Sequence, residues 1–199
     1  MVTLYWAPQS RAFRALWLLE EIGRPYEKVL VDIRAPGHPT ADYLRINPMG
    51  KVPAVRDGAV TVAESGAISA YLGDRFPEAG LAPAIGDPDR ARYLQWLFFS
   101  PGCIEGSFIE KFGKLELPRM AAGWGSFDTV MDVLETELSK GPWLLGDRFS
   151  AADVLIGADL QFGVEVFKLI SGRPAIEAYV ERCKARPAHQ RAVKLDAPA

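Results

Sequence analysis

Gly50-Lys51-Val52-Pro53-Ala54-Val55 is the stretch that decides the fold of this chain, because its proline stands immediately before a predicted strand. Bonds to proline lack the strong trans preference of other peptide bonds, and we expect the bond between Val52 and Pro53 to be cis. Such a proline leaves the N–H and C=O of Val52 on a free sheet edge, where an extended peptide can pair. The competing interpretation is ordinary turn chemistry at a Val-Pro step.

A second stretch, Glu64-Ser65-Gly66-Ala67-Ile68, follows a short hairpin that the Asp57-Gly58 pair predicts. Ser65 begins an apolar-periodic helix, so a carboxylate placed there meets a hydroxyl and the first free N–H groups at the positive end of the helix. Lys51 and Glu64 add one charge of each sign. Together the two stretches suit a ligand with two carboxylates, one ammonium and a central extended peptide unit. The alternative is that Ser65 only caps its helix.

The chain has 199 residues, of which 49% are hydrophobic and 24% are charged, so it can bury a substantial core. A net charge of -2 argues against a nucleic-acid partner. The sequence shows no secretion signal and no apolar stretch long enough to span a bilayer, and we expect a cytoplasmic protein with no membrane partner. Cys103 and Cys183 lie far apart and without metal-ligand spacing, which predicts neither a disulfide nor a metal site.

Strand and helix patterns alternate in the first part of the chain in the order βαβαββα, which predicts an α/β domain at residues 1–77. The expected elements are strands at residues 2–5 and 26–31, helices from about residue 12, around residues 40–46 and at residues 65–76, and the hairpin between the last two helices.

Helical patterns dominate the rest of the chain. Residues 78–86, rich in Pro, Gly and Ala, are predicted to be a linker, and residues 87–199 an all-helical domain. Asp87-Pro88 offers a cap and a first-turn proline for its first helix, and the last helix is expected to run from about residue 174 to residue 185.

Phe149-Ser150-Ala151-Ala152-Asp153-Val154 is the clearest helix start in the chain. Ser150 can cap the helix, Asp153 stands where a reciprocal capping carboxylate belongs, and Phe149 can pack on Val154. The helix that follows is apolar almost all round, which places it at the centre of a helical bundle.

With these patterns in place, the chain resembles the cytosolic glutathione transferases, in their serine-type, bacterial-like form, over essentially its whole length. Four segments carry the resemblance: Leu18–Glu27, Asn47–Ala54, Glu64–Ile68 and Ser150–Asp153. The resemblance implies a thioredoxin-like N-terminal domain followed by an all-α helical bundle, glutathione as co-substrate with no metal, and a homodimer. It also implies conjugation of the glutathione thiolate to small hydrophobic electrophiles, as in detoxification.

The family's glutathione-binding pattern carries over to five positions of this sequence. Val52, next to the cis Pro53, would pair its backbone with the cysteinyl part of glutathione. Glu64 and Ser65 would hold the γ-glutamyl end. Lys51 would approach the glycyl carboxylate.

Ser10 is the catalytic candidate. A free thiol with a pKa of about 8.5 is mostly protonated at neutral pH, and each unit of depression needs about 1.4 kcal/mol of preferential thiolate stabilisation. Ser10 precedes a helix that begins near Arg11, so its hydroxyl can donate to the sulfur while the helix end contributes its dipole. The alternative is that Ser10 only caps this helix. Ser10 with Arg14 four positions later matches one serine-type subgroup, whereas other serine types have their serine where this chain has Ala7.

Other candidates are weaker. Tyr5 lies inside the first strand, where we expect its side chain in the core or on a sheet face, and His38 lies in an unanchored loop, where we expect it to face solvent rather than to assist Lys51. The segment Pro101–Ser107 either borders the electrophile pocket or makes a simple bend. That pocket is expected between the two domains, and its candidate lining residues are Trp6, Trp96, Phe99, Phe108 and Trp124.

Two other functions remain open from the sequence. One is glutathione-dependent isomerisation or peroxide reduction at the same site, and the other is a glutathione-binding or interaction module without useful turnover. Cysteine-based disulfide reduction is disfavoured, because no cysteine precedes Cys103.

Overall fold

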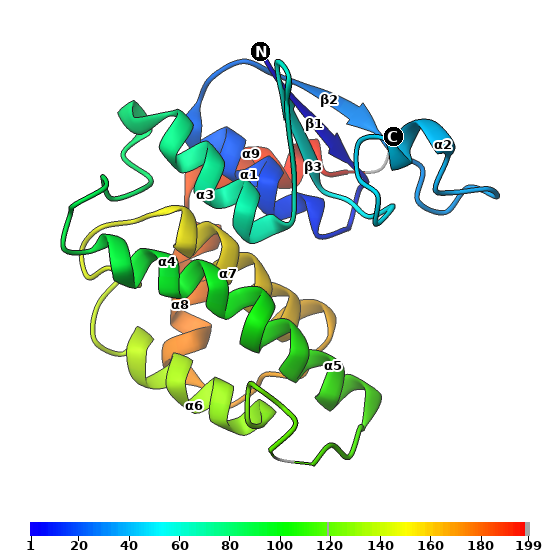
Figure 1. Cartoon of the computed structure of the whole chain (residues 1–199). Helices are drawn as coiled ribbons and strands as arrows, with labels where there is room; N and C mark the ends of the chain where they lie inside the picture. Colours follow the sequence, from blue (N-terminus) through cyan, green and yellow to red (C-terminus); the bar gives the residue numbers. More distant parts are fainter. Residues whose placement is uncertain (119, 198–199) are drawn as a thin grey trace. The chain divides into compact units, whose positions relative to one another are not determined.

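A four-stranded mixed sheet is the framework of the N-terminal part of the protein (Figure 1). The computed structural model describes residues 1–118 and 120–197. The strands are β1 (Val2–Trp6), β2 (Tyr26–Leu30), β3 (Ala54–Asp57) and β4 (Val60–Ala63). They lie in the order β2-β1-β3-β4, with β1 and β2 parallel and β3 antiparallel to both of its neighbours. The predicted strands and hairpin are confirmed.

The helices that alternate with these strands complete the predicted order βαβαββα. They are α1 (Ala12–Ile22), α2 (Ala41–Leu44) and α3 (Ser65–Arg75), followed by the short 3-10 turn η1 (Pro77–Ala79). Thr40 caps α2 by accepting a hydrogen bond from the N–H of Tyr43. Leu16, Trp17 and Leu18 of α1 are fully buried, so this helix supplies a large part of the core of its unit.

The chain contacts define two units, and they place the C-terminal segment with the sheet. One unit holds Met1–Ala79 together with the segment from Arg186 onward, and the other holds Gly80–Ala185. The C-terminal segment forms a helix, α9 (Pro187–Leu195), which packs along α1 (Figure 1). The sequence pattern predicts a last helix that ends near residue 185 and a helical domain that extends to residue 199, so α9 is a helix that this pattern does not predict.

Ion pairs and three buried side chains, two alanines and a histidine, attach α9 to α1. The guanidinium of Arg186 pairs with Glu21 at 2.6 Å between Nε and Oε1, and that of Arg191 pairs with Glu20 at 2.7 Å between Nε and Oε2. The buried side chains of α9 are Ala188, His189 and Ala192. This short and weakly apolar face explains why periodicity did not reveal the helix.

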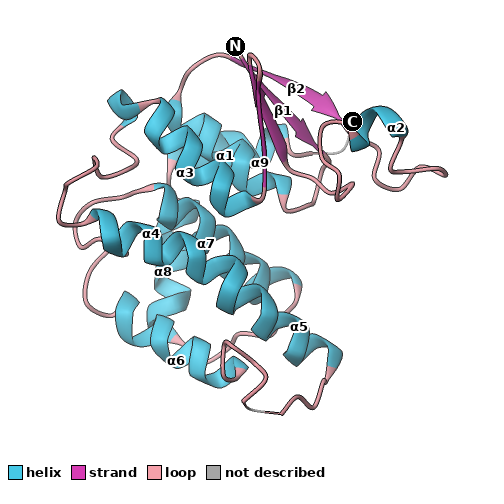
Figure 2. Ribbon diagram, in the orientation of Figure 1, coloured by secondary structure: helices cyan, strands magenta, loops and turns pink. Residues whose placement is uncertain are grey.

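The second unit is helical (Figure 2). Its α-helices are α4 (Arg90–Phe99), α5 (Glu105–Gly113), α6 (Phe127–Leu138), α7 (Ala151–Gln161) and α8 (Pro174–Lys184), with π-helical turns η2 (Ser100–Ile104) and η3 (Phe162–Val166). The interruption predicted near Pro101 is the turn η2. The first helix starts at Arg90, with Asp89 as its N-cap. Asp87 and Pro88 lie in the turn before it, where Asp87 accepts from the N–H of Asp89 at 2.9 Å. Within the described residues, none of the helices has the length and apolarity to cross a membrane.

The predicted helix start at Ser150 is confirmed as a reciprocal capping box on α7. The carboxylate of Asp153 also accepts from the N–H of Leu144 at 2.9 Å and from the hydroxyl of Tyr179 at 3.0 Å. Burial raises the pKa of Asp153 to about 6. Ten successive residues of α7, from Ala151 to Leu160, are buried, as the all-round apolar pattern predicts.

Candidate functional site

Three chain segments leave the sheet at the same edge. In the strand register, Ala54 of β3 lies opposite both Tyr5 of β1 and Ala63 of β4. Because β3 is antiparallel to both neighbours, the residues before Ala54 meet the residues that follow Tyr5 and Ala63. These segments are Val52–Pro53, the loop that holds Ser10, and Glu64–Ser65.

The hydrogen bonds before Pro53 hold Lys51 and not Val52. The Val52–Pro53 peptide bond is cis, as expected. The C=O of Lys51 accepts from the Tyr43 hydroxyl at 2.6 Å and from Nδ2 of Asn47 at 2.7 Å. Burial raises the pKa of Tyr43 to about 12, so its hydroxyl remains a donor at neutral pH. Among the residues that the structure describes, none forms a hydrogen bond with the N–H or C=O of Val52.

The N-terminus of α3 is open to an anion. Glu64, just before the helix, is exposed, has a φ of 67° and does not cap the helix with its side chain. The hydroxyl of Ser65 is not the cap either, because it accepts from Nη1 of Arg14 at 3.4 Å. Arg14 is only 7% exposed. A hydroxyl, a buried guanidinium and uncapped helix N–H groups together favour a carboxylate here.

Lys51 and His38 flank the same edge. Lys51 is exposed, and no described residue forms an ion pair with its ammonium. His38 does not simply face solvent: it is partly buried, its Nε2 lies 2.9 Å from the C=O of Gly50, and its ring centroid lies 5.8 Å from that of Tyr43. Since a carbonyl only accepts, Nε2 carries the proton in this contact. His38 thus anchors the backbone just before Lys51.

Ser10 lies in the turn that leads into α1. Its Oγ donates to the C=O of Ala7 at 2.7 Å and accepts from the N–H of Ala12 at 3.1 Å. These two bonds hold Ser10 in the turn before Arg11, the N-cap of α1, and donation to a sulfur requires the O–H to rotate away from Ala7. The other donor candidate, Tyr5, is 8% exposed, and its ring packs 6.1 Å from that of Tyr43, as expected of a core residue.

The aromatic residues predicted for the electrophile pocket are buried or half-buried. Trp6, Trp96 and Phe108 are 7%, 3% and 8% exposed, while Phe99 and Trp124 are intermediate. Trp96 meets Phe99 edge to face with ring centroids 5.2 Å apart. Contacts of this kind are typical of a core, and the composition of the electrophile pocket stays a prediction.

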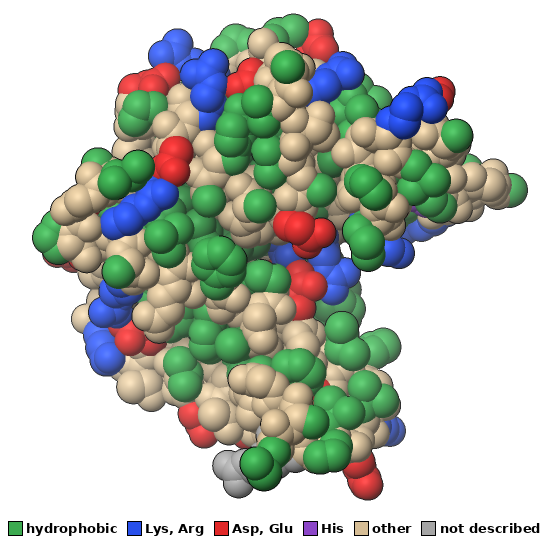
Figure 3. Space-filling model, in the orientation of Figure 1, with side chains coloured by type: hydrophobic (Ala, Val, Ile, Leu, Met, Phe, Trp, Pro, Cys, Tyr) green, Lys and Arg blue, Asp and Glu red, His purple; other side chains and the backbone are tan. Residues whose placement is uncertain are grey.

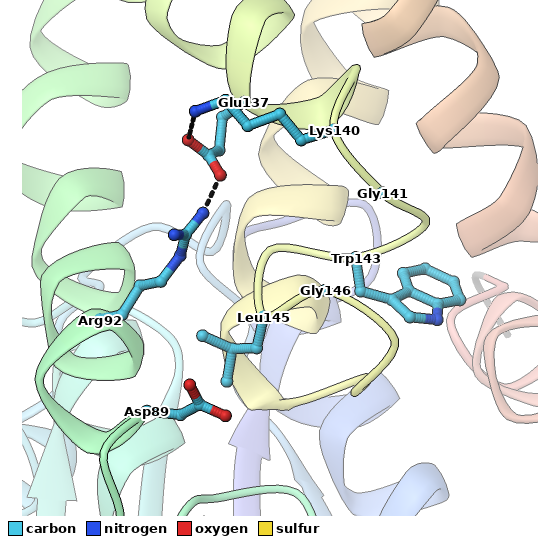
Figure 4. Close-up of a pocket in the computed structure, with 8 residues that line it drawn as sticks. All are labelled: Asp89, Arg92, Glu137, Lys140, Gly141, Trp143, Leu145 and Gly146. Atoms are coloured by element: carbon cyan, nitrogen blue, oxygen red, sulfur yellow. Dashed lines mark hydrogen bonds and ion pairs between the residues drawn. The ribbon is translucent and has the colours of Figure 1, made fainter.

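A hollow of about 320 Å³ lies in the helical unit beside α4, the end of α6 and the loop before α7 (Figure 4). Glu137 lies between two cations: it accepts from Nζ of Lys140 at 3.0 Å and pairs with Arg92. Arg92 also donates to the C=O of Leu144 at 3.0 Å, and the indole of Trp143 points away from the hollow. Because these charges satisfy one another, we assign the hollow to helix packing rather than to ligand binding.

Apolar side chains gather at the surface of the helical unit near the end of α5 (Figure 3). Phe112 is 69% exposed, and its ring centroid lies 5.9 Å from that of Phe167, which is 39% exposed. Ile109, Leu115 and Leu117 are exposed as well. Exposed apolar clusters of this kind are typical of surfaces that contact a ligand or partner.

Both cysteines lie in the helical unit. Cys103 is half-buried in η2, where burial raises the pKa of its thiol, and Cys183 is buried on α8. In residues 1–118 and 120–197, no group of three or more His, Cys, Asp or Glu side chains could hold a metal ion.

Comparison with known proteins identifies the family. Two domain models match the chain: "Glutathione S-transferase, N-terminal domain" at residues 1–74 and "Glutathione S-transferase, C-terminal domain" at residues 118–182. A crystal structure of a glutathione transferase from Methylococcus capsulatus is 34% identical and covers 98% of each chain with a TM-score of 0.82. A sphingomonad glutathione S-transferase solved with glutathione is 32% identical over 99% of this chain and 100% of that chain, with a TM-score of 0.80.

One curated relative carries a different name. The disulfide-bond oxidoreductase YfcG of Escherichia coli is 27% identical over 94% of this chain and 92% of its own length. The predicted fold, a thioredoxin-like N-terminal domain followed by a helical domain, is confirmed by the sheet order and by the solved structures. With both of its domains matched and a relative 34% identical over nearly the full length, the chain belongs to the glutathione S-transferase family.

Proposed function

We propose that this enzyme conjugates the thiolate of glutathione to small hydrophobic electrophiles. The convergence of three features at one sheet edge carries the proposal: the unpaired backbone of Val52, the uncapped start of α3 and the Ser10 loop. Glutathione presents the complementary groups, namely an extended peptide unit, two carboxylates and one ammonium. The sphingomonad relative solved with glutathione supports this ligand.

Each end of the tripeptide has a partner of suitable charge. The backbone of Val52, set by the cis Pro53, pairs with the cysteinyl unit. Ser65 and the α3 N-terminus receive the γ-glutamyl carboxylate, and Glu64 receives the ammonium of the same residue. Lys51 approaches the glycyl carboxylate.

Ser10 assists the chemical step as a hydrogen-bond donor, and the sulfur of the substrate is the nucleophile. The thiol proton leaves to solvent, and the Ser10 O–H turns from Ala7 to the thiolate, beside the positive end of α1. A sulfur lone pair then forms the C–S bond while a leaving group departs with its electron pair, or while an addition acceptor takes up a proton. Hydrophobic side chains of the helical domain supply the electrophile pocket.

The same proposal covers domain roles and assembly. Residues 1–77, with α9, form the glutathione-binding domain, and residues 78–86 form the linker. The other helices of the predicted domain 87–199 form the domain that binds the electrophile. Membership of the family supports pairing into a homodimer and a cytoplasmic location.

The test is the ultraviolet absorbance of bound glutathione thiolate as the pH is varied. In the wild type we expect the bound thiol to titrate below the pKa of about 8.5 of a free thiol. In Ser10→Ala we expect this pKa to rise by about one unit, which corresponds to about 1.4 kcal/mol of lost thiolate stabilisation, with little change in KM for glutathione. Ser126→Ala is the control, because it removes a serine cap of another helix, α6, and should leave the titration unchanged.

The outcomes separate the competing functions. Saturable glutathione binding without a depressed thiol pKa would identify a binding module rather than an enzyme. An unchanged titration in Ser10→Ala would remove Ser10 from the mechanism. Because YfcG is named a disulfide-bond oxidoreductase, turnover is also measured with disulfides, peroxides and isomerisable substrates alongside the electrophiles. Faster turnover of one of those classes would replace conjugation as the main activity.

A further inference from the structure

Asp196, directly after α9, reaches the loop that holds Ser10. Its Oδ2 accepts a hydrogen bond from the backbone N–H of Gln9 at 3.0 Å, across a sequence separation of 187 residues. The N–H of Asp196 itself donates to the C=O of Ala192 at 2.9 Å, so the residue is fixed at the C-terminus of α9. The ion pairs of α9 with α1 hold that helix in turn.

The hydrogen bond to Asp196 stabilises an unusual backbone conformation of Gln9. Its φ is 53°, in the left-handed region that side chains other than glycine rarely adopt. Because Gln9 immediately precedes Ser10, its backbone angles set where the Ser10 side chain points at the start of α1. A partner that holds the N–H of Gln9 therefore also determines the position of the Ser10 hydroxyl.

Asp196 occupies a place that is unfavourable for a carboxylate. It caps the C-terminus of α9, where the helix dipole is negative. Its Oδ1 is buried and, in the described part of the chain, has no hydrogen-bond partner. Burial raises the pKa of Asp196 to about 6. A carboxylate that is disfavoured both by the negative helix end and by the burial of an unpaired oxygen is typical of a functional position.

One cation on β2 partly offsets these costs. The ammonium of Lys28 donates to the C=O of Leu195 at 2.8 Å and lies 4.2 Å from the ring centroid of Trp6, and its charge lowers the pKa of Asp196. Beyond Lys28, Glu20 on α1 is the next charge that acts on this ammonium. The loop side contributes only the uncharged N–H of Gln9. Asp196 is therefore ionised at neutral pH and becomes protonated below about pH 6.

We propose that Asp196 is a positioning residue for glutathione activation: by holding Gln9 in its left-handed conformation, it fixes the Ser10 hydroxyl at the N-terminus of α1. The inference rests on the proposed role of Ser10. With this role, the segment after Arg186 belongs to the site that binds glutathione rather than to the helical unit.

The test compares two substitutions of Asp196 with a control that loosens α9 elsewhere. Asp196→Ala removes the acceptor, Asp196→Asn keeps an acceptor but removes the charge, and Arg191→Met removes the ion pair with Glu20 without touching Gln9. We expect Asp196→Ala to raise the pKa of bound glutathione thiol by about 0.5 to 1 unit, with KM for glutathione within about twofold of the wild type. Asp196→Asn should show a smaller rise, and Arg191→Met none.

A rescue experiment distinguishes positioning from mere anchoring of the C-terminus. Glycine adopts the left-handed conformation without a partner, so adding Gln9→Gly to Asp196→Ala should recover at least about half of the shift in thiol pKa. The rate difference between wild type and Asp196→Asn should be present above about pH 6 and shrink below it, where the wild-type carboxyl is also protonated.

The failures are distinguishable. If the thiol of glutathione bound to Asp196→Ala titrates as in the wild type, while in Ser10→Ala it does not, the inference is overturned and the proposed function stands. If Ser10→Ala also leaves the titration unchanged, the proposed role of Ser10 fails first. If Arg191→Met raises the pKa of the bound thiol as much as Asp196→Ala does, the positioning role is overturned. It is also overturned if adding Gln9→Gly to Asp196→Ala does not reduce the rise in this pKa. Asp196→Asn, which keeps size and acceptor, carries the test if Asp196→Ala does not fold.

Discussion

Arg14 on α1 donates from Nη1 to the hydroxyl of Ser65 at the first position of α3, with 3.4 Å between the two atoms. The contact joins the helix that follows the Ser10 loop to the helix that receives the γ-glutamyl carboxylate in our proposal. Because Arg14 is buried, its guanidinium acts in a medium where its interaction with an anion is poorly screened. The pair therefore links the two halves of the candidate site.

We expect Arg14→Lys to raise KM for glutathione by about tenfold, or about 1.4 kcal/mol, while kcat changes less, because the planar donor that orients Ser65 is lost. Steady-state kinetics of this variant, of Ser65→Ala and of the double variant form the measurement. The two effects on KM should be less than additive, since the residues act as a pair. Full additivity would contradict the coupling.

The charge of Lys51 should act mainly on binding. Lys51→Met is expected to raise KM for glutathione about three- to tenfold and to make KM less sensitive to salt, because an exposed ammonium attracts the glycyl carboxylate through screened electrostatics. KM is measured at low and at high ionic strength. Lys114→Met, a substitution at an exposed lysine of the helical unit, is the control and should change neither value. An equal salt dependence in Lys51→Met and wild type would argue against this role.

Gly50 should be intolerant of any side chain. Its φ is 65°, and a Cβ placed there would lie 2.6 Å from Cγ of Pro39. Gly37 has a φ of 86° but nothing within 4 Å of such a Cβ, so Gly37→Ala isolates the backbone cost. We expect Gly37→Ala to lower the free energy of unfolding by about 1 kcal/mol, and Gly50→Ala by about 1 to 3 kcal/mol more. Denaturant unfolding checks both, and equal losses would mean that the Pro39 contact yields easily.

Much of the fold was predictable because its signals are local. The Asp57-Gly58 turn, the Ser150 to Asp153 capping box and the cis bond before Pro53 are all written in a few adjacent residues, and all are found. The positions of Val52 and Ser65 on one sheet edge followed from the short hairpin between them.

The rest of the site depends on contacts between residues that no local pattern connects. Tyr43 and Asn47 hold the C=O of Lys51, His38 contacts the C=O of Gly50, and Asp196 meets the N–H of Gln9. In each case a side chain binds a backbone atom, and any residue supplies a backbone atom, so the sequence of the partner carries no signal. The sequence pattern did not predict α9 for a related reason: its buried residues, two alanines and a histidine, pack on α1 without forming a strong apolar stripe.

That fit gives a last prediction. Ala192 of α9 is fully buried on a helix that packs along α1, whereas its neighbour Val193 is 48% exposed. Ala192→Leu adds three carbon atoms to a filled interface and should lower the free energy of unfolding by about 1 to 3 kcal/mol, while Val193→Leu should change it by less than about 0.5 kcal/mol. Both are measured by denaturant unfolding, together with the pKa of bound glutathione thiol. Arg191→Met removes only a half-exposed ion pair, whereas Ala192→Leu displaces α9 itself from α1 and with it Asp196. Ala192→Leu should therefore raise that pKa as well, and loss of stability with an unchanged thiol pKa would show that α9 serves the fold alone.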